Sequence, residues 1–354
     1  MPSFGLMTDG IRNLSRFTLF AKEAERMGFE RTLLFTPNDV DFHSRTIRAL
    51  CYHKGSWVRL RCRYPSIAHD VGFYTDAKSI RLVKRYKSNV KFTGYGLGNK
   101  WHIHNRLMQS SFSKYVPETE LYRTPSTALN FLKNYGSIML KPINGKQGRG
   151  IVKLTFHEDQ AVKPYEWQQS GQPKLYLPRQ ELIRKLRRDC KPFGAVVQRW
   201  LDIRNPRGQV FDIRALVQKE PGERWILTEM GVRLSQVGHI ASNVTRGGSV
   251  KSIQSFLPEL YGEEAAERII EECRNIALTL PSELEGLYQK PFAELGIDLA
   301  VEQGGAVRII EVNVKPGKKI VRALSGKDAY ADAMLRPVRY AKWLNDCALQ
   351  TKGS

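Results

Sequence analysis

Two acidic side chains lie on either side of a glycine pair near the carboxyl end of the 354-residue chain. Asp298 and Glu311 belong to two apolar, β-branched runs separated by Gly304-Gly305, a strong signal for a two-residue hairpin loop. Such a loop pairs Val301 with Arg308 and places Asp298 directly opposite Glu311. Residues that face each other in this way have Cβ atoms about 5 Å apart. The sequence therefore predicts two neighbouring carboxylates on one face of a sheet.

The opposed carboxylates predict a divalent-cation site. Two carboxylates in a largely apolar sheet repel each other, and their burial without a cation is costly. Asn313, two residues after Glu311, shares their face and adds an amide oxygen. Two carboxylates and an amide, completed by phosphate and water oxygens, suit Mg²⁺, with Mn²⁺ as the alternative ion. The open alternative is that Asp298 and Glu311 simply face solvent.

A glycine-rich loop between two predicted strands offers backbone N–H groups to a phosphate. One strand ends in Lys141 and the next covers residues 151–156, so the loop is the flap of a hairpin. Glycines allow a close backbone approach, and lysine adds a point charge. The known phosphate loops that lead into a helix do not fit, because a strand follows. A plain glycine-rich turn is the alternative. The residues expected to contact the ligand are Lys141, Gly145, Lys146, Gln147, Gly148 and Gly150.

Further charged and amide side chains lie between the flap and the carboxylate hairpin. Asp212 and Arg214 alternate along one predicted strand and therefore share a face. Arg233 follows, and then a glycine-containing loop that carries Asn243 and Arg246. Together these groups suit the stabilisation of a transferring phosphoryl group or the binding of a carboxylate.

The elements that must position these groups have an α/β pattern. A strand at 4–7, a helix at 17–27 and a strand at 32–36 open the chain. Residues 57–63 alternate, which predicts a half-buried strand with arginines on the solvent face and Val58, Leu60 and Cys62 on the other. Residues 158–180 are polar and rich in Pro, Gln and Gly, so we expect a loop or a poorly ordered insertion there.

The charge balance says more about partners than about fold. The chain has 56 Lys and Arg against 35 Asp and Glu, a formal net charge of +21. Nucleic acid, an acidic peptide, a polyanionic surface and a phosphorylated ligand are all compatible with it. Nucleic acid ranks last, since no aromatic-studded reading surface stands out. The sequence has no apolar run of about 18 residues and a short, polar N-terminus, which predicts a soluble cytoplasmic protein without a membrane span.

In their order along the chain, these motifs resemble those of ATP-grasp ligases. The resemblance rests on Lys100 at a helix start, Lys141-Pro142 with its flap, Asp212-x-Arg214, Ser242-Asn243-x-x-Arg246-Gly247-Gly248, and Asp298…Glu311-x-Asn313-x-x-Pro316-Gly317. The last run resembles the glutamate-adding RimK-type branch. Over about residues 1–345 the chain is most similar to the YheC/YheD family of endospore coat-associated proteins.

The resemblance implies an α/β ATP-grasp fold in which ATP lies between two antiparallel sheets. Lys100 and Lys141 would hold the α- and β-phosphates, and the flap would cover the γ-phosphate. The strand 196–201 would present Gln198, Arg199, Trp200 and Leu201 to adenine, and Asp202 is a candidate for the ribose. Asp298, Glu311 and Asn313 would bind Mg²⁺, with Arg214, Arg233 and Arg246 at the transferring phosphoryl group.

The implied domains follow a glycine cluster at residues 94–98 that marks a junction. We expect an N-terminal α/β pre-ATP-grasp domain at 1–95, a central ATP-grasp subdomain with the flap at 96–198, a C-terminal subdomain with the carboxylate hairpin at 199–345, and a tail at 346–354.

The implied activity is that of an ATP- and Mg²⁺-dependent carboxylate–amine ligase that works through an acyl phosphate. Given the basic surface, we expect an amino acid or an acidic peptide as substrate. The alternative is a non-catalytic, ATP-binding assembly protein associated with the endospore coat and its proteins. One position departs from some ATP-grasp ligases, which have arginine two residues before the metal-binding aspartate, where this chain has Gly296.

Overall fold

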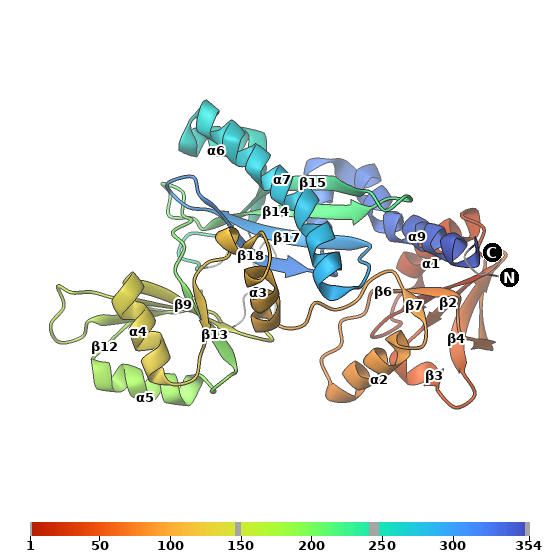
Figure 1. Ribbon diagram of the computed structural model, residues 1–354, viewed down its shortest axis with the longest axis horizontal. Coiled ribbons are helices and arrows are strands. Elements are labelled where there is room, and N and C mark those ends of the chain that lie inside the picture. The colour runs from red at the N-terminus through yellow and green to blue at the C-terminus, as the bar shows by residue number, and fades with distance from the viewer. Residues whose placement is uncertain (1, 146–149, 241–247, 351–354) are drawn as a thin grey trace.

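The computed structural model describes residues 2–145, 150–240 and 248–350, and builds them around three β-sheets. The three sheets lie side by side along the long axis of the molecule, and both ends of the chain lie near the first sheet (Figure 1). Among the described residues, no helix is long and apolar enough to cross a membrane.

The first sheet has seven strands in the order β3-β4-β2-β1-β6-β7, with β5 paired to β4. Its strands are β1 (Ser3–Met7), β2 (Arg31–Phe35), β3 (Val40–Asp41), β4 (Thr46–His53), β5 (Ser56–Arg63), β6 (Ile67–Asp70) and β7 (Lys91–Phe92). The accompanying helices are α1 (Leu14–Arg26), the 3-10 turn η1 (Pro37–Asp39) and α2 (Ala77–Lys87). Because β1, β2, β6 and β7 run parallel, the loops after β1 and β6 meet at one edge of the sheet.

The predicted burial of residues 57–63 was wrong. The strand exists as β5, but the side chains of Val58 and Leu60 are 51% and 45% exposed. The reason is that β5 is an edge strand, paired with β4 alone among the described strands, so that its apolar side chains lie beyond the packed core.

The second sheet is antiparallel and has six strands in the order β12-β11-β10-β9-β13-β8. Its strands are β8 (Thr119–Leu121), β9 (Ser137–Pro142), β10 (Val152–Phe156), β11 (Tyr165–Gln168), β12 (Leu175–Leu177) and β13 (Ala195–Arg199). The helices in this part are α3 (Lys100–Met108), the 3-10 turn η2 (Ser113–Tyr115), α4 (Pro125–Tyr135) and α5 (Arg179–Asp189). The prediction of a loop at 158–180 was wrong, because this stretch contains the strands β11 and β12. β11 pairs with β10, and its Trp167 is buried.

The third sheet is antiparallel, with the order β16-β15-β14-β17-β18. Its strands are β14 (Phe211–Lys219), β15 (Trp225–Leu234), β16 (Ser249–Ser252), β17 (Glu294–Val301) and β18 (Val307–Asn313). The helices are α6 (Ile253–Tyr261), α7 (Glu263–Tyr288), α8 (Lys319–Leu324) and α9 (Gly326–Gln350).

The two faces of the third sheet have different cover. The odd-numbered residues of β14, from Phe211 to Val217, pack with the apolar stripe of α7 in one core. On the opposite face, Leu216 packs with residues of α8 and α9. Asp212 and Arg214 share that second face, nearer the start of the strand, and they line a cleft.

Helix α9 ties the third sheet to the first. It runs back towards α1 (Figure 1), where Val338, Ala341 and Leu344 pack with Phe17 and Phe20. Helix α9 therefore links the first sheet to the third through two separate apolar clusters, one with α1 and one with Leu216 of β14 and residues of α8.

Candidate active site

A cleft of about 2080 Å³ opens between the three sheets. Its lining comes from the end of β6 and the loop after it, the start of α3, the β9–β10 flap, the linker after β13, and one face of the third sheet. This volume exceeds the roughly 300–1,000 Å³ of a site for one small ligand. The cleft therefore has room for two ligands.

The carboxylate hairpin forms as β17 and β18, with Asp298 directly opposite Glu311. The prediction of this pair is confirmed. Asp298 is buried and Glu311 is half-buried, and both line the cleft together with Asn313. Asn313 lies opposite Gly296, one step further along the same face.

The predicted register was nevertheless wrong next to the loop. Val301 pairs with Val307 instead of Arg308, because Glu302 N donates to Ala306 O over 3.0 Å and the loop has one residue more than Gly-Gly. A shift between Asp298 and Leu299 then inserts one extra residue into β18. This β-bulge restores the pairing of the two acids.

Asp298 is held between two arginines from neighbouring strands. Arg214 lies opposite it on β14, with Nη1 2.6 Å from Asp298 Oδ1, and Arg233 Nη2 lies 3.0 Å from Oδ2. Arg233 also grips Asp212 with two bonds of 2.6 Å. Burial lowers the pKa of Arg233, but the facing carboxylates of Asp212 and Asp298 outweigh it and raise that pKa overall. Burial lowers the pKa of Arg214.

One oxygen of this cluster lacks a well-directed partner. Although Arg214 Nη1 and Asp298 Oδ1 are 2.6 Å apart, neither atom makes a hydrogen bond of acceptable geometry among the described residues. The two atoms therefore form an ion pair, but the N–H of Arg214 does not point at the carboxylate oxygen as a hydrogen bond requires. The lone pairs of this buried oxygen are open to another donor or to a cation.

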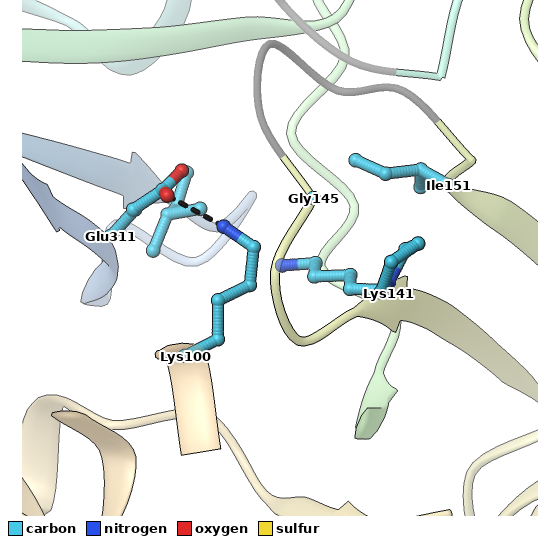
Figure 2. Close-up of a pocket in the computed structure, with 7 residues that line it drawn as sticks. Lys100, Lys141, Gly145, Ile151 and Glu311 are labelled. Carbon is cyan, nitrogen blue, oxygen red and sulfur yellow. Dashed lines mark hydrogen bonds and ion pairs between the residues drawn. The ribbon is translucent and has the colours of Figure 1, made fainter. Parts of the chain in front are cut away.

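Glu311 is paired with Lys100, the first residue of α3. Lys100 Nζ lies 2.5 Å from Glu311 Oε1, and Figure 2 shows the lysine reaching from the helix to β18. Asn99 caps α3 by accepting from His102 N over 2.9 Å, which fixes where the helix begins. Lys100 N also donates to Ile143 O over 3.2 Å, so the helix start is tied to the chain leaving β9.

Lys141 is buried on β9, and its ammonium group points into the same space as that of Lys100 (Figure 2). Its Nζ donates to Gln198 Oε1 over 2.5 Å. Burial, and then the charge of Lys100, lowers the pKa of Lys141 to about 8. A smaller cavity of about 60 Å³ lies against both lysines, Gly145 and Glu311.

The flap is a hairpin loop, as predicted, because β9 and β10 pair from Leu140–Val152 to Ser137–Thr155. Gly150 has a φ of 73°, and a Cβ there would lie 3.0 Å from Pro142 Cγ, so the position favours glycine. Lys146, Gln147 and Gly148 lie outside the described residues, as do Asn243 and Arg246.

Of the residues expected at the adenine and the ribose, four line the cleft and Asp202 does not. Gln198, Arg199, Trp200 and Leu201 line the cleft. The Arg199 guanidinium is engaged by Glu118 at 2.7 Å and by Glu302 at 2.7 Å, so it bridges the second and third sheets. Asp202 is not part of the lining and is held by Arg204 through bonds of 2.7 and 2.9 Å.

The donor set fits a hard divalent cation. Among the described residues no group of three or more His, Cys, Asp or Glu gathers, so a site built from those side chains alone is not formed there. Asp298, Glu311 and Asn313 instead provide two carboxylates and an amide on one face, and the poorly paired Asp298 Oδ1 lies among them. Oxygen donors of this kind are those that Mg²⁺ prefers when phosphates complete its shell.

Gly296 has a role that the sequence did not reveal. A Cβ at this position would lie 2.7 Å from Arg214 Nη1 and 2.8 Å from Pro316 Cβ. The guanidinium of Arg214 therefore lies across the backbone of Gly296, in the space where a side chain at 296 would begin.

The sequence analysis also missed a second charged cluster, in which Asp70 forms ion pairs of 2.9 Å with both Lys87 and Lys315. The lysine-rich stretch after Asn313 was its signal.

One mixed sheet and two antiparallel sheets, with a cleft between them, form the fold of an ATP-grasp protein. The chain belongs to the family described as YheC/D like ATP-grasp, which matches residues 89–344. The predicted family and fold are confirmed.

Relatives and solved structures agree with this assignment. The endospore coat-associated protein YheC of Bacillus subtilis is 25% identical over 336 residues, with 90% of this chain and 91% of YheC covered. YheD of the same organism is 24% identical over 330 residues, with 89% and 71% covered. Among solved structures, the D-cycloserine synthetase DcsG has a TM-score of 0.56 at 11% identity, with 95% of this chain and 99% of DcsG covered. D-alanyl-alanine synthetase A of Vibrio cholerae has a TM-score of 0.55 at 11% identity, with 96% and 98% covered. At these identities the structural likeness shows the fold.

Proposed function

We propose that the protein is an ATP- and Mg²⁺-dependent ligase that joins a carboxylate to an amine. The observation that carries the proposal is the meeting of Lys100 and Lys141 with Asp298 and Glu311 inside one cleft beside the flap. Two cationic side chains next to two carboxylates suit a nucleotide whose phosphates bring a divalent cation with them. The names of the structural neighbours, two synthetases and a D-alanine-D-alanine ligase, support the reaction class.

The roles of the residues follow from where they lie. Lys100 and Lys141 would bind phosphate oxygens, and Gln198 would keep the Lys141 ammonium directed into the cleft. Gln198, Arg199, Trp200 and Leu201 would lie along the base, and the flap from Gly145 to Gly150 would cover the γ-phosphate. Asp298, Glu311 and Asn313 would hold Mg²⁺, which supplies charge neutralisation at the phosphates.

Arg214 and Arg233 would stabilise charge on the transferring phosphoryl group. In the first step a substrate carboxylate oxygen attacks the γ-phosphorus, the bond to the β-phosphate oxygen breaks, and ADP leaves. In the second step an amine attacks the acyl carbon of the acyl phosphate, inorganic phosphate leaves, and the amine loses a proton. Because Asp212 holds Arg233 through two bonds, the guanidinium is already oriented before the reaction.

The test is a condensation assay with the purified chain. It is incubated with ATP, Mg²⁺ and pooled amino acids or acidic peptides, and ADP release and a condensed product are followed by mass spectrometry. We expect both from the wild type and neither from Glu311→Gln. Folded wild-type protein that binds ATP and yields neither with any pool would refute the ligase.

A second candidate is a non-catalytic ATP-binding protein of spore coat assembly, and the printed names of YheC and YheD favour it. Coat association, with its protein partners, and a cytoplasmic site of synthesis belong to the proposal in either case. The two candidates are separated by Glu311→Ala in the cell: loss of function with normal abundance and location supports the ligase, whereas full function supports the scaffold.

A further inference from the structure

The cleft extends well past the phosphate-binding lysines, towards the first sheet. This part, here called the basic end, is formed by the loop after β6, by α2, by the end of α7 and by the start of α8. Five lysines line it, namely Lys84, Lys87, Lys290, Lys315 and Lys319. The acids in its lining are Asp70 and Glu294.

Both acids are already neutralised inside the protein. Asp70 is held between Lys87 and Lys315, each at 2.9 Å. Glu294 accepts from Lys318 at 2.7 and 2.9 Å and from Gln218 at 2.9 Å, and all three side chains are buried. Neither carboxylate is therefore placed to bind a cationic ligand in the cleft.

Three of the lysines have no such partner. Lys84, Lys290 and Lys319 are exposed, and none lies within ion-pair distance of a carboxylate in the part of the chain that the structure describes. They come from α2, from the segment after α7 and from α8, so three separate parts of the lining each contribute one of these charges. Point charges at several separated positions suit a ligand that carries several negative charges along its length.

Aromatic surface lies beside these charges. Phe73 is 55% exposed in the loop after β6, and Lys315 Nζ lies 5.1 Å from the ring centre of Tyr74. Lys290 lies 5.1 Å from the ring centre of Tyr95. The basic end therefore offers apolar surface to a side chain or backbone as well as charge to carboxylates.

We propose that the basic end binds an acidic peptide segment, with several carboxylates along an extended chain, as the acid substrate. This inference rests on the proposed function, because a ligase of this class needs a carboxylate in the cleft. The cleft volume favours an extended chain over a single amino acid, and the lysines favour repeated carboxylates. Lys84 and Lys319 are assigned as specificity-determining residues.

The test measures binding of a fluorescein-labelled octaglutamate by anisotropy, in the presence of a non-hydrolysable ATP analogue and Mg²⁺. The double charge reversal K84E/K319E is compared with K78E/K327E, which reverses two exposed lysines of α2 and α9 outside the cleft lining. We expect about a tenfold or greater loss of affinity for K84E/K319E and less than about a twofold loss for the control, since each reversal exchanges attraction for repulsion. Wild-type binding should weaken as salt rises.

Equal binding of octaglutamine, or unchanged binding by K84E/K319E, would overturn the proposal. Tighter, lysine-dependent binding of oligothymidylate would also overturn it, in favour of a nucleic-acid site. Binding of the ATP analogue by every variant shows that the cleft is folded. The condensation assay with ATP separates the two proposals. Octaglutamate that binds but gives no ADP release in that assay supports the basic end and counts against the ligase, whereas ADP release with a neutral acid and no octaglutamate binding supports the ligase and overturns the basic end.

Discussion

Replacing Lys100 with methionine should tighten the binding of a divalent cation in the absence of nucleotide. Lys100 Nζ lies 2.5 Å from Glu311 Oε1, so the lysine and a cation compete for the same carboxylate. The two side chains are 21% and 35% exposed, which places the pair in partly screened surroundings. Ion pairs of this kind contribute about 1 kcal/mol or less. Release of Glu311 should therefore raise the cation affinity by about two- to fivefold.

The assay uses Mn²⁺ as the probe, because its free form is quantified directly by electron paramagnetic resonance. Wild type and Lys100→Met are titrated without nucleotide, and thermal unfolding checks that both are folded. The matched control is Lys78→Met, which removes an exposed lysine that does not line the cleft. The same substitution in a Glu311→Gln background completes a double-mutant cycle.

The result that refutes this reasoning is unchanged or weaker Mn²⁺ binding by folded Lys100→Met. A tightening that persists in the Glu311→Gln background would also refute it, because the effect would then not pass through Glu311. With nucleotide present the sign should reverse, since Lys100→Met removes a phosphate ligand. General damage to the fold can only weaken Mn²⁺ binding, so an increase is diagnostic.

Three further perturbations follow from the site and its surroundings. Because burial lowers the pKa of Lys141 to about 8, its charge is lost as pH rises through that value, and affinity for an ATP analogue should fall between pH 7 and 9, whereas Lys141→Arg should show a flatter profile by calorimetry. Gly296→Ala places a Cβ 2.7 Å from Arg214 Nη1 and should lower the free energy of unfolding by about 1–3 kcal/mol in urea, whereas Gly317→Ala, with nothing within 4 Å, should have little effect. Burial lowers the pKa of His69 to about 4, so the unfolded chain takes up its proton first as the pH falls, and stability should decrease by up to about 3 kcal/mol from pH 6.5 to 4, a loss that His69→Gln reduces. A free energy of unfolding of Gly296→Ala equal to that of the wild type would contradict the second expectation. A His69→Gln variant that loses as much stability between pH 6.5 and 4 as the wild type would contradict the third.

The sequence allowed the carboxylate pair to be predicted for a reason that was only partly correct. Counting outward from Gly304-Gly305 gives the right partner for Asp298 and the wrong one for Val301. The longer loop shifts the pairing of β17 and β18 by one residue, and the bulge in β18 shifts it back by one residue. The two shifts therefore cancel at Asp298 and Glu311. Hairpin loop length and bulges depend on local twist and packing, which a single sequence does not encode in any simple period.

Strand edges were the other source of error. The apolar alternation of residues 57–63 indicates a strand but not whether anything covers it, and β5 proved to be an edge strand. The polar stretch 158–180 contains β11, where pairing with β10 and burial of Trp167 override a loop-like composition. Both errors arise because burial depends on tertiary neighbours, whereas periodicity is local.

The two opposed acids, Asp298 and Glu311, already have internal cations beside them, so a divalent ion is not their only source of positive charge. Opposed carboxylates in a sheet need positive charge, and the chain supplies it from Arg214, Arg233 and Lys100. A divalent ion must therefore displace or rearrange internal cations, and a nucleotide offers those cations new partners in its phosphates. Each ligand thus removes part of the cost of binding the other, which is a coupling free energy between two sites. The two opposed acids are each paired with an internal cation, Asp298 with Arg214 and Arg233 and Glu311 with Lys100, and this arrangement favours joint binding of nucleotide and metal over binding of either alone.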